Sequence, residues 1–460
     1  MKELTAPERP PVVMTADLKR NLRSWLTQQR SSYSNYYVNE ALDLLENADS
    51  STDWPARSRS YNGYVRELAV RALACHRSQD ALHTLLERAN DWVPSVREQA
   101  LLGIESYLEE DQVFLLLQNL PRLLTLSRQQ RGDHRTLLLR IQALLAKAEH
   151  ASEVRATWFG LRGQASRFLF GLLADSDASS DLLLQALRHP DPVVRTMTLE
   201  AGRHLSEMSR QQLLLAALHN HSATVRGRAL RLLVDEAMPH HEALEGGLLD
   251  SSASVRSMAL WYAQRSNIQP TQTLARRVAG AMPATTSNWL GVLGLSTTLG
   301  QPVPSEWREA ALRSTSARVR LAAILQSDDT EISVLMELLD DASPKVFRGA
   351  MMKLVKLPWQ TLQQPVCQYL ERHWKTLEAT RRDLVFRLLA YWQRMEFLLN
   401  KVDKEQNSNY WLNELRAWSY QRYPALDSLT SREERRALGE RIKHLVNTGQ
   451  LPKDSLTCID

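Results

Sequence analysis

Apolar positions along this chain follow a helical spacing, and one arrangement of them recurs. A valine begins each occurrence, an arginine usually stands beside it, and an alanine usually follows four positions later. The seven valines are Val65, Val96, Val194, Val225, Val255, Val319 and Val346. Successive valines are separated by 31, 98, 31, 30, 64 and 27 residues, which are close to whole multiples of about 31. A fixed period of this size predicts a solenoid of stacked repeats.

The positions around each valine predict a helix start and a buried face. Six side chains that can cap the free N–H groups of a helix stand three residues before it, namely Asn62, Asp191, Ser222, Ser252, Ser316 and Ser343. Only Val93 interrupts this set, and only Thr198 replaces the alanine four residues after the valine. Residues i and i+4 share one face of a helix, so we expect both to point into the core.

Each repeat is predicted to be a pair of helices. A leucine-rich first helix, a polar turn and the valine-led second helix are clearest in residues 178–205. Two earlier stretches, 16–30 and 35–47, have amphipathic spacing and predict helices that cap the array within residues 14–50. The Pro-rich residues 1–13 are expected to form a flexible tail.

The pattern fades towards the end of the chain. We therefore place the repeat array at residues 14–357 and an atypical helical C-terminal cap at 358–460, with two helices expected over 367–400. A terminal repeat must cover a core that would otherwise be exposed. The aromatic residues crowded between Tyr410 and Tyr423 fit that need, and docking of a partner on them is the alternative.

These features resemble the HEAT-repeat family, especially the short bacterial form also called the phycobilisome-lyase HEAT-like repeat. The resemblance rests on the Val-Arg pair, the alanine and the Asp/Pro turn, as in Pro190-Asp191-Pro192. Weaker copies are expected near 128–170 and 280–295, where Arg135 and Trp289 stand close to the repeat position. The resemblance implies an all-α fold, an α-solenoid whose second helices line a concave face that holds a protein or a nucleic acid. It implies no single activity.

Composition narrows the class of protein only slightly. The 57 basic and 52 acidic residues give a net charge of +5, less than the dense basic field of most dedicated nucleic-acid proteins. Three widely spaced cysteines predict a reducing compartment. No apolar run is long enough for a membrane span or a secretory signal, so the cytoplasm is the expected location.

No constellation of residues predicts catalysis. The chain has no GxSxG, GxxxxGK[ST] or HExxH motif. The pairs His219 with His221 and His240 with His241 each offer only two metal ligands and are expected to be exposed turn residues. We therefore predict no catalytic residue, no metal and no cofactor, and an enzymatic activity is disfavoured but left open.

The arginines beside the valines form a ladder with two interpretations. They would project from equivalent places on successive helices, where a guanidinium can bind two phosphate oxygens. In HEAT-like arrays, arginine at this place commonly bonds carbonyls or an acidic group in adjacent turns. We favour this structural role for Arg66, Arg97, Arg195, Arg226, Arg256 and Arg320.

Positions six and ten residues after each valine are expected to face the concave surface. They are mixed in character, and acids interrupt both rows. The candidate partner-binding residues, drawn mainly from these rows and the aromatic cap, are Arg71, Arg203, Arg231, Trp261, Arg265, Lys356, Trp411 and Trp418.

Three functions follow from these expectations. We favour a non-catalytic scaffold or adaptor that binds a protein on its concave face. The alternative is a nucleic-acid-binding protein, similar in outline to HEAT-like alkylpurine DNA glycosylases, in which Trp158, Trp261 and Trp289 would stack on bases. A small-molecule enzyme such as a chromophore lyase has only the shared repeat name in its support. The partner, the pathway and the oligomeric state are left open.

Overall fold

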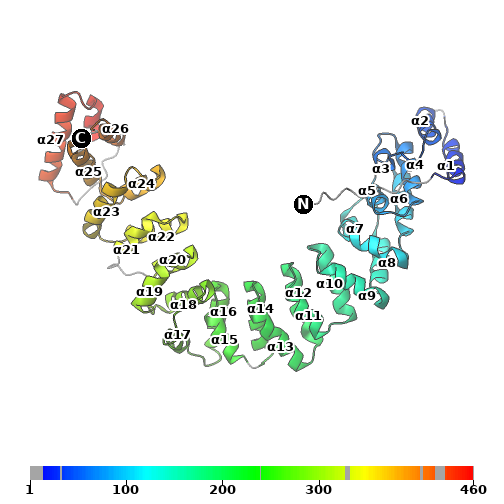
Figure 1. The fold of residues 1–460 in the computed structure, drawn as a ribbon, viewed down its shortest axis with the longest axis horizontal. Helices are drawn as coiled ribbons and strands as arrows, with labels where there is room; N and C mark the ends of the chain where they lie inside the picture. The colour runs from blue at the N-terminus through cyan, green and yellow to red at the C-terminus, as the bar shows by residue number, and fades with distance from the viewer. Residues whose placement is uncertain are drawn as a thin grey trace. The chain divides into compact units, whose positions relative to one another are not determined.

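The chain folds as an α-solenoid of HEAT-like helical hairpins (Figure 1). The computed structural model describes residues 14–31, 34–238, 240–326, 332–404, 408–419 and 430–458. Within these ranges the secondary structure is helical and no strand occurs, so the predicted fold class is confirmed. The expected tail, residues 1–13, lies outside the described residues. None of the described helices combines the length and the hydropathy that crossing a bilayer requires.

Contacts divide the chain into two compact units, Met1–His240 and His241–Asp460. The helices of the first unit are α1 (Ala16–Gln28), α2 (Asn35–Glu46), α3 (Trp54–Arg57), α4 (Gly63–Ala74), α5 (Gln79–Arg88), α6 (Pro94–Glu105), α7 (Val113–Thr125), α8 (Arg135–Leu145), α9 (Ala151–Trp158), α10 (Gln164–Ser176), α11 (Ser180–Ala186), α12 (Pro192–Ala201), α13 (Glu207–Leu218) and α14 (Ala223–Asp235). Helices α1 and α2 confirm the two helices predicted ahead of the repeats.

The second unit continues with helices of similar length. They are α15 (His241–Leu248), α16 (Ala253–Ala263), α17 (Pro270–Val278), α18 (Thr286–Leu299), α19 (Ser305–Leu312), α20 (Ala317–Ile324), α21 (Ile332–Glu337), α22 (Pro344–Leu354), α23 (Trp359–His373), α24 (Ala379–Phe386), α25 (Tyr391–Lys404), α26 (Ser408–Ser419) and α27 (Arg432–Asn447). The expectation of two helices over 367–400 was wrong, because the end of α23, all of α24 and most of α25 occupy it.

Short 3-10 helices supplement the α-helices. They are Glu110–Gln112, Leu126–Arg128, Ala148–His150, Gly202–His204, Leu338–Asp340 and Lys453–Cys458.

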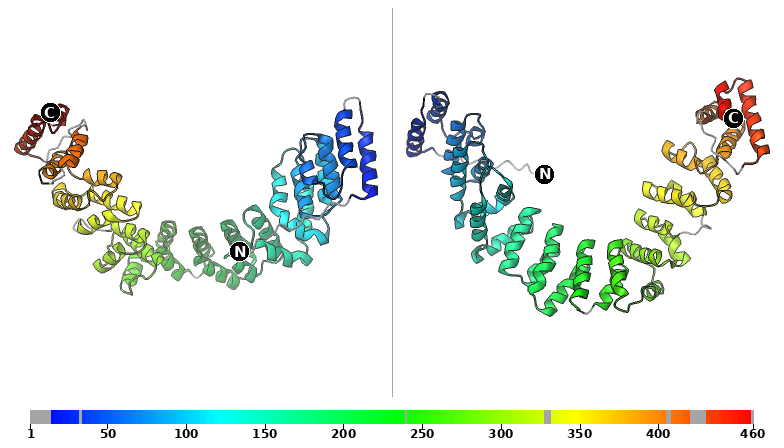
Figure 2. Two further views of the ribbon diagram at one scale, coloured as in Figure 1. Left: turned by 45° about the horizontal axis from the view of Figure 1, so that its top comes forward. Right: turned by 180° about the vertical axis from the view of Figure 1, so that it is seen from behind.

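Within each unit the hairpins stack so that first helices lie beside first helices and second helices beside second helices. In the first unit α10 packs on α12 and α12 on α14, while α11 packs on α13. In the second unit α16, α18, α20 and α22 form one row, and α15 packs on α17 in the other (Figures 1 and 2). Each unit therefore presents one face built from second helices and one built from first helices.

The repeat valines form the seam of this stack. All seven are buried, and so are the six alanines and the one threonine that follow four residues later. Thr198 fits the alanine position because its hydroxyl donates to the carbonyl of Val194 at 2.9 Å, which satisfies the buried polar group. Burying an aliphatic side chain contributes on the order of 1.5–3 kcal/mol, so the recurring valine is a main source of stability.

The turn before each second helix differs from the sequence prediction. Asn62 and Asp191 cap their helices with a side-chain oxygen, but Ser222, Ser252, Ser316 and Ser343 do not. The side chain two residues before the cap instead accepts the cap residue's own N–H. This acceptor occurs in all seven repeats, as Ser60, Asp91, His189, Asn220, Asp250, Ser314 and Asp341. A side chain that bonds the backbone two residues on closes the turn locally, as Asx turns do.

Candidate partner-binding surface

The second helices expose a narrow arc of side chains. Counting from the repeat valine, positions −1, +2, +6, +9 and +10 fall within an arc of about 100° at 3.6 residues per turn. All five positions are exposed in the repeats of Val255 and Val346. We call these positions the exposed arc. It contains both rows, +6 and +10, that the sequence singled out.

Large apolar side chains recur at position +6 of the exposed arc. In the second unit these are Trp261 on α16, Leu325 at the C-terminal cap of α20 and Met352 on α22, which are 50, 61 and 67% exposed. In the first unit Leu102 on α6 is 58% exposed at the same position. Single exposed apolar residues are ordinary on protein surfaces. Their repetition in one register, on α16 and on the adjacent helices α20 and α22, is what distinguishes this row. Helix α18, which lies between α16 and α20, carries no large exposed apolar side chain.

The charge of the exposed arc differs between repeats. On α6 the arc carries Glu98 and Glu105, and Glu105 is paired with Arg140 at 3.0 Å. In the α22 repeat it carries Lys345 and Arg348 on the helix and Lys356 just after the C-cap, all exposed. The charge of the exposed arc is therefore mixed when averaged over all repeats, although single repeats are distinctly acidic or basic.

Two further candidates in the second unit, Arg265 and Lys356, lie on the same arc. Arg265 occupies position +10 of the α16 repeat, just after the C-cap, and its guanidinium carbon lies 3.6 Å from the centre of the Trp261 ring. A guanidinium over an indole face is attracted by the ring electrons. Trp261 and Arg265 thus form one amphipathic platform.

In the first unit Arg203 and Arg71 are held by acids or an aromatic ring. Arg203 pairs with Glu200 at 2.6 Å, and Arg228 contacts the other oxygen of the same carboxylate. Arg71 bonds Glu67 at 2.9 Å and lies over the ring of Trp25, 4.4 Å from its centre. Their guanidinium groups thus have partners within the fold already.

Arg231 and Lys356 are exposed, at +6 of α14 and at +10 of the α22 repeat. Among the exposed candidates the structure therefore brings Trp261 and Arg265 together, while Arg231 and Lys356 lie in other repeats.

The ladder arginines bond the turns of their own repeats. The Nη1 atom of Arg66 donates to the carbonyls of Ser60 and Tyr61 at 2.9 and 3.0 Å. The same bonding, to one or both carbonyls five and six residues earlier, is made by Arg97, Arg226, Arg256 and Arg320. Arg195 makes no such bond to the described residues of its turn. For these five arginines we propose a structural role, since part of each guanidinium is engaged by backbone.

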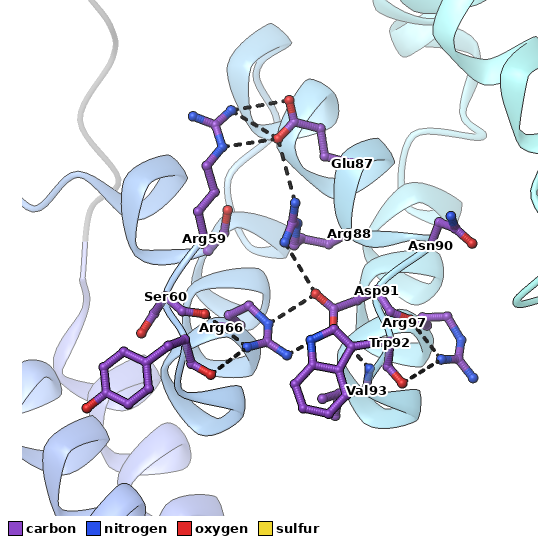
Figure 3. A network of polar contacts seen from close by, with 12 residues as sticks. Arg59, Ser60, Arg66, Glu87, Arg88, Asn90, Asp91, Trp92, Val93 and Arg97 are labelled. Atoms are coloured by element: carbon purple, nitrogen blue, oxygen red, sulfur yellow. Dashed lines mark hydrogen bonds and ion pairs between the residues drawn. The ribbon is translucent and has the colours of Figure 1, made fainter.

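Asp91 shows how one turn is joined to its neighbour (Figure 3). Its carboxylate accepts two bonds from Arg66, at 3.1 and 3.0 Å, and one from Arg88 at 3.3 Å. It also accepts the backbone N–H of Val93 at 2.9 Å. Arg320 and Asp341 repeat this bridge between α20 and the turn before α22, with an Nη2–Oδ1 distance of 2.8 Å.

The two tryptophans of α26 are not accessible as a contact surface. Trp411 and Trp418 are buried. Trp411 packs on Trp374 and Phe397, and Trp418 packs on Tyr391. Their proposal as partner-binding residues is therefore corrected, because rings that fill a core are not accessible to a partner. Tyr420 and Tyr423 lie outside the described residues.

Burial also removes two of the proposed base-stacking residues. Trp158 is fully buried and stacks on His189, with ring centres 4.9 Å apart, and Trp289 is buried against Trp307. Among the three tryptophans named for stacking, only Trp261 is exposed. In the described ranges no three His, Cys, Asp or Glu side chains gather as a metal site would require.

One exposed feature escaped the sequence prediction. Tyr36, Tyr37, Tyr61 and Trp92 are exposed aromatic residues of the first unit, and Tyr37 lies 6.4 Å from Tyr61 between ring centres. Tyr61 and Trp92 both stand four residues before a repeat valine. An aromatic residue at that position in consecutive repeats was the available signal.

Comparisons with known proteins give distant structural neighbours only. No family model matches the chain, and no curated protein matches it. Importin beta aligns with 13% identity and a TM-score of 0.27, over 88% of this chain and 67% of that one. Kap95p, solved with RanGDP, aligns with 12% identity and a TM-score of 0.28, over 97% and 66%. The karyopherin Kap121p, bound to the C-terminus of a protein phosphatase, aligns with 13% identity and a TM-score of 0.25, over 96% and 49%.

This chain thus spans about half to two thirds of the length of these karyopherins. The short bacterial repeat subtype rests on the sequence pattern alone.

Proposed function

We propose that the chain is a protein-binding scaffold that uses the exposed arc of its second unit as the contact surface. The observation that carries the proposal is the row of exposed apolar side chains at position +6, Trp261, Leu325 and Met352. Interface cores are enriched in tryptophan and methionine, and an apolar row rimmed by charge is a common form of docking surface. A stacked array holds such a row in place, so little ordering of the scaffold is needed on binding.

The test replaces the row and asks which proteins are lost. Full-length protein is used to capture partners from cells that produce it, followed by mass spectrometry. In the variant Trp261→Ser/Leu325→Ser/Met352→Ser we expect specific partners to disappear. The control replaces equally exposed apolar residues on first helices, as Phe114→Ser/Met208→Ser, and should retain them. Loss of the same partners in both variants, or in neither, would contradict the proposal.

Nucleic-acid binding remains the second candidate because α22 and the turn after it present three exposed cations. A filter-binding titration of single-stranded DNA at increasing salt separates the two. Binding whose logarithm falls steeply with the logarithm of salt concentration would favour the nucleic acid. We expect no such binding, because only one of the proposed stacking tryptophans is accessible.

A further inference from the structure

The exposed arc of α22 combines positive charge with apolar surface. Lys345, Arg348, Met352, Val355 and Lys356 occupy its five positions, and Met352 and Val355 are about two-thirds exposed. We call this set the α22 stripe. Three of its members are basic and two are large and apolar, and none is acidic.

No carboxylate of the described residues forms an ion pair with Lys345, Arg348 or Lys356. Within the described residues, the Arg348 guanidinium donates only to the carbonyl of Pro344, one turn earlier in the same helix. These cations contrast with the basic side chains of the ladder, which are engaged by turns. Their charge is therefore available to a partner.

The neighbouring helix extends the surface. Gly349 faces α20 so closely that a Cβ there would lie 2.7 Å from a methyl carbon of Leu321, so the two helices are in intimate contact. The exposed arc of α20 presents Arg318 at position −1 and Leu325 at position +6. Met352 occupies the same position, +6, in the α22 repeat. Leu325 and Met352 thus lie on adjacent helices in the same register, and helices in contact are about 8–10 Å apart.

We propose that the α22 stripe, together with Leu325 and Arg318, binds an acidic peptide segment that carries large apolar side chains. The inference rests on the proposed scaffold function and names the chemistry of its partner. Apolar side chains of the segment would cover Leu325, Met352 and Val355, and its carboxylates would meet the flanking cations. The stripe from Lys345 to Lys356 is about 16 Å long at 1.5 Å per residue, which suits two to three turns of an amphipathic helix.

Charge complementarity selects this occupant over others. A purely acidic ligand would leave the apolar residues of the stripe exposed, and a purely apolar one would desolvate three cations without pairing them. A nucleic acid would pair with the cations, but its bases would find no aromatic side chain beside Leu325 and Met352 on which to stack. An acidic and apolar segment satisfies both halves of the surface.

The test selects peptides without assuming a sequence. A displayed library of random peptides of about 16 residues is panned against the full chain, and enriched peptides are labelled for fluorescence anisotropy. We expect net negative charge and at least two large apolar residues in the enriched set. Lys345→Glu/Arg348→Glu should weaken their binding roughly 10- to 30-fold, since each reversal replaces attraction by repulsion. Met352→Ser should weaken it about tenfold.

The matched control reverses two exposed arginines of α27 with the same change in net charge, Arg432→Glu/Arg436→Glu. It should leave the affinity within about twofold, and circular dichroism checks that every variant is folded. Equal weakening by the control would mean that net charge alone attracts the peptides, and that result overturns the proposal.

The other outcomes also decide between explanations. Enriched peptides that are basic, or that lack apolar residues, would overturn the proposal. So would α22-dependent binding of a single-stranded DNA probe in place of peptide, or self-association on sedimentation that Lys345→Glu/Arg348→Glu abolishes. If no acidic peptide binds but Trp261→Ser/Leu325→Ser/Met352→Ser still loses captured proteins, this inference fails and the scaffold function stands. If neither effect occurs, both fail.

Discussion

Removing the Asp91 carboxylate tests whether burial makes the ion pair between Arg66 and Asp91 a large contributor to the free energy of unfolding. The side chains of Arg66 and Asp91 are 3 and 2% exposed. Asp91→Ala would remove two charge-assisted bonds to Arg66 and leave its guanidinium charge buried without that partner. Breaking a buried ion pair from one side typically costs about 3–5 kcal/mol. The two backbone carbonyls that Arg66 also bonds would soften the loss, so we expect about 3 kcal/mol.

The comparison is a second bridge drawn in the same view (Figure 3). Arg59 bonds Glu87 through contacts of 3.0 to 3.3 Å, which is similar geometry, but their side chains are 57 and 31% exposed. Exposed pairs contribute about 0.2–1 kcal/mol because water screens them. Arg59→Ala should therefore destabilise the unit by less than about 1 kcal/mol.

The assay combines urea unfolding with hydrogen exchange. Repeat arrays can unfold in parts, so exchange in the peptides of α4 to α6 should report the loss where it arises. Adding Arg66→Met to Asp91→Ala should recover about 2 kcal/mol, because it removes the orphaned charge. If Asp91→Ala destabilised the unit no more than Arg59→Ala, the reasoning from burial would be refuted.

Three further predictions concern the second unit and the thiols. Burial raises the pKa of Asp341, but bonds from its arginine partner and a backbone N–H lower it more. The pKa of Asp341 therefore lies below 3.8, the ordinary value for an aspartate. Its contribution to stability should thus persist above pH 3.8 and be lost at lower pH, and urea midpoints of Asp341→Asn should lack that loss. Gly291→Ala should lower the melting temperature, since a Cβ would lie 1.9 Å from a backbone carbonyl oxygen, whereas Gly246→Ala meets no atom within 4 Å and should stabilise its helix by about 0.5–1 kcal/mol. Burial and two nearby glutamates raise the pKa of Cys367 to about 11, and burial raises the pKa of Cys75 as well. Because Cys75 is exposed, maleimide labelling at pH 7.5, mapped by mass spectrometry, should modify it before Cys367.

Sequence periodicity predicted the repeat well because its cause is local. Valine and alanine four residues apart must share a helix face, and that face must be covered, so Val225 and Ala229 could be assigned to the core without coordinates. The exposed arc followed from the same geometry, since helical spacing places positions +6 and +10 about 100–140° away from the seam.

The turn chemistry was predicted less well, because several side chains can compete for the same N–H groups. The serine at position −3 looked like a helix cap, yet Asp250 and Asp341 at position −5 accept the N–H of that serine instead. The residue types alone do not show which of these side chains accepts a given N–H group. The choice depends on the loop's path between two packed helices.

The aromatic C-terminal region shows the same limit for burial. Tryptophans such as Trp411 and Trp418 are typical of protein cores and of interfaces, and the sequence left both interpretations open. Their burial against Trp374 and Tyr391 depends on how α25 and α26 pack, which involves residues distant along the chain.

By itself, the sequence determined that this chain is a stack of two-helix units, because helical spacing and a fixed period are properties of the chain alone. Only the tertiary structure decided which polar and aromatic side chains are buried in contacts that stabilise the stack and which remain exposed. That division depends on neighbours brought together by packing, as when the guanidinium of Arg66 is buried against Asp91 while those of Arg318 and Arg348 face solvent.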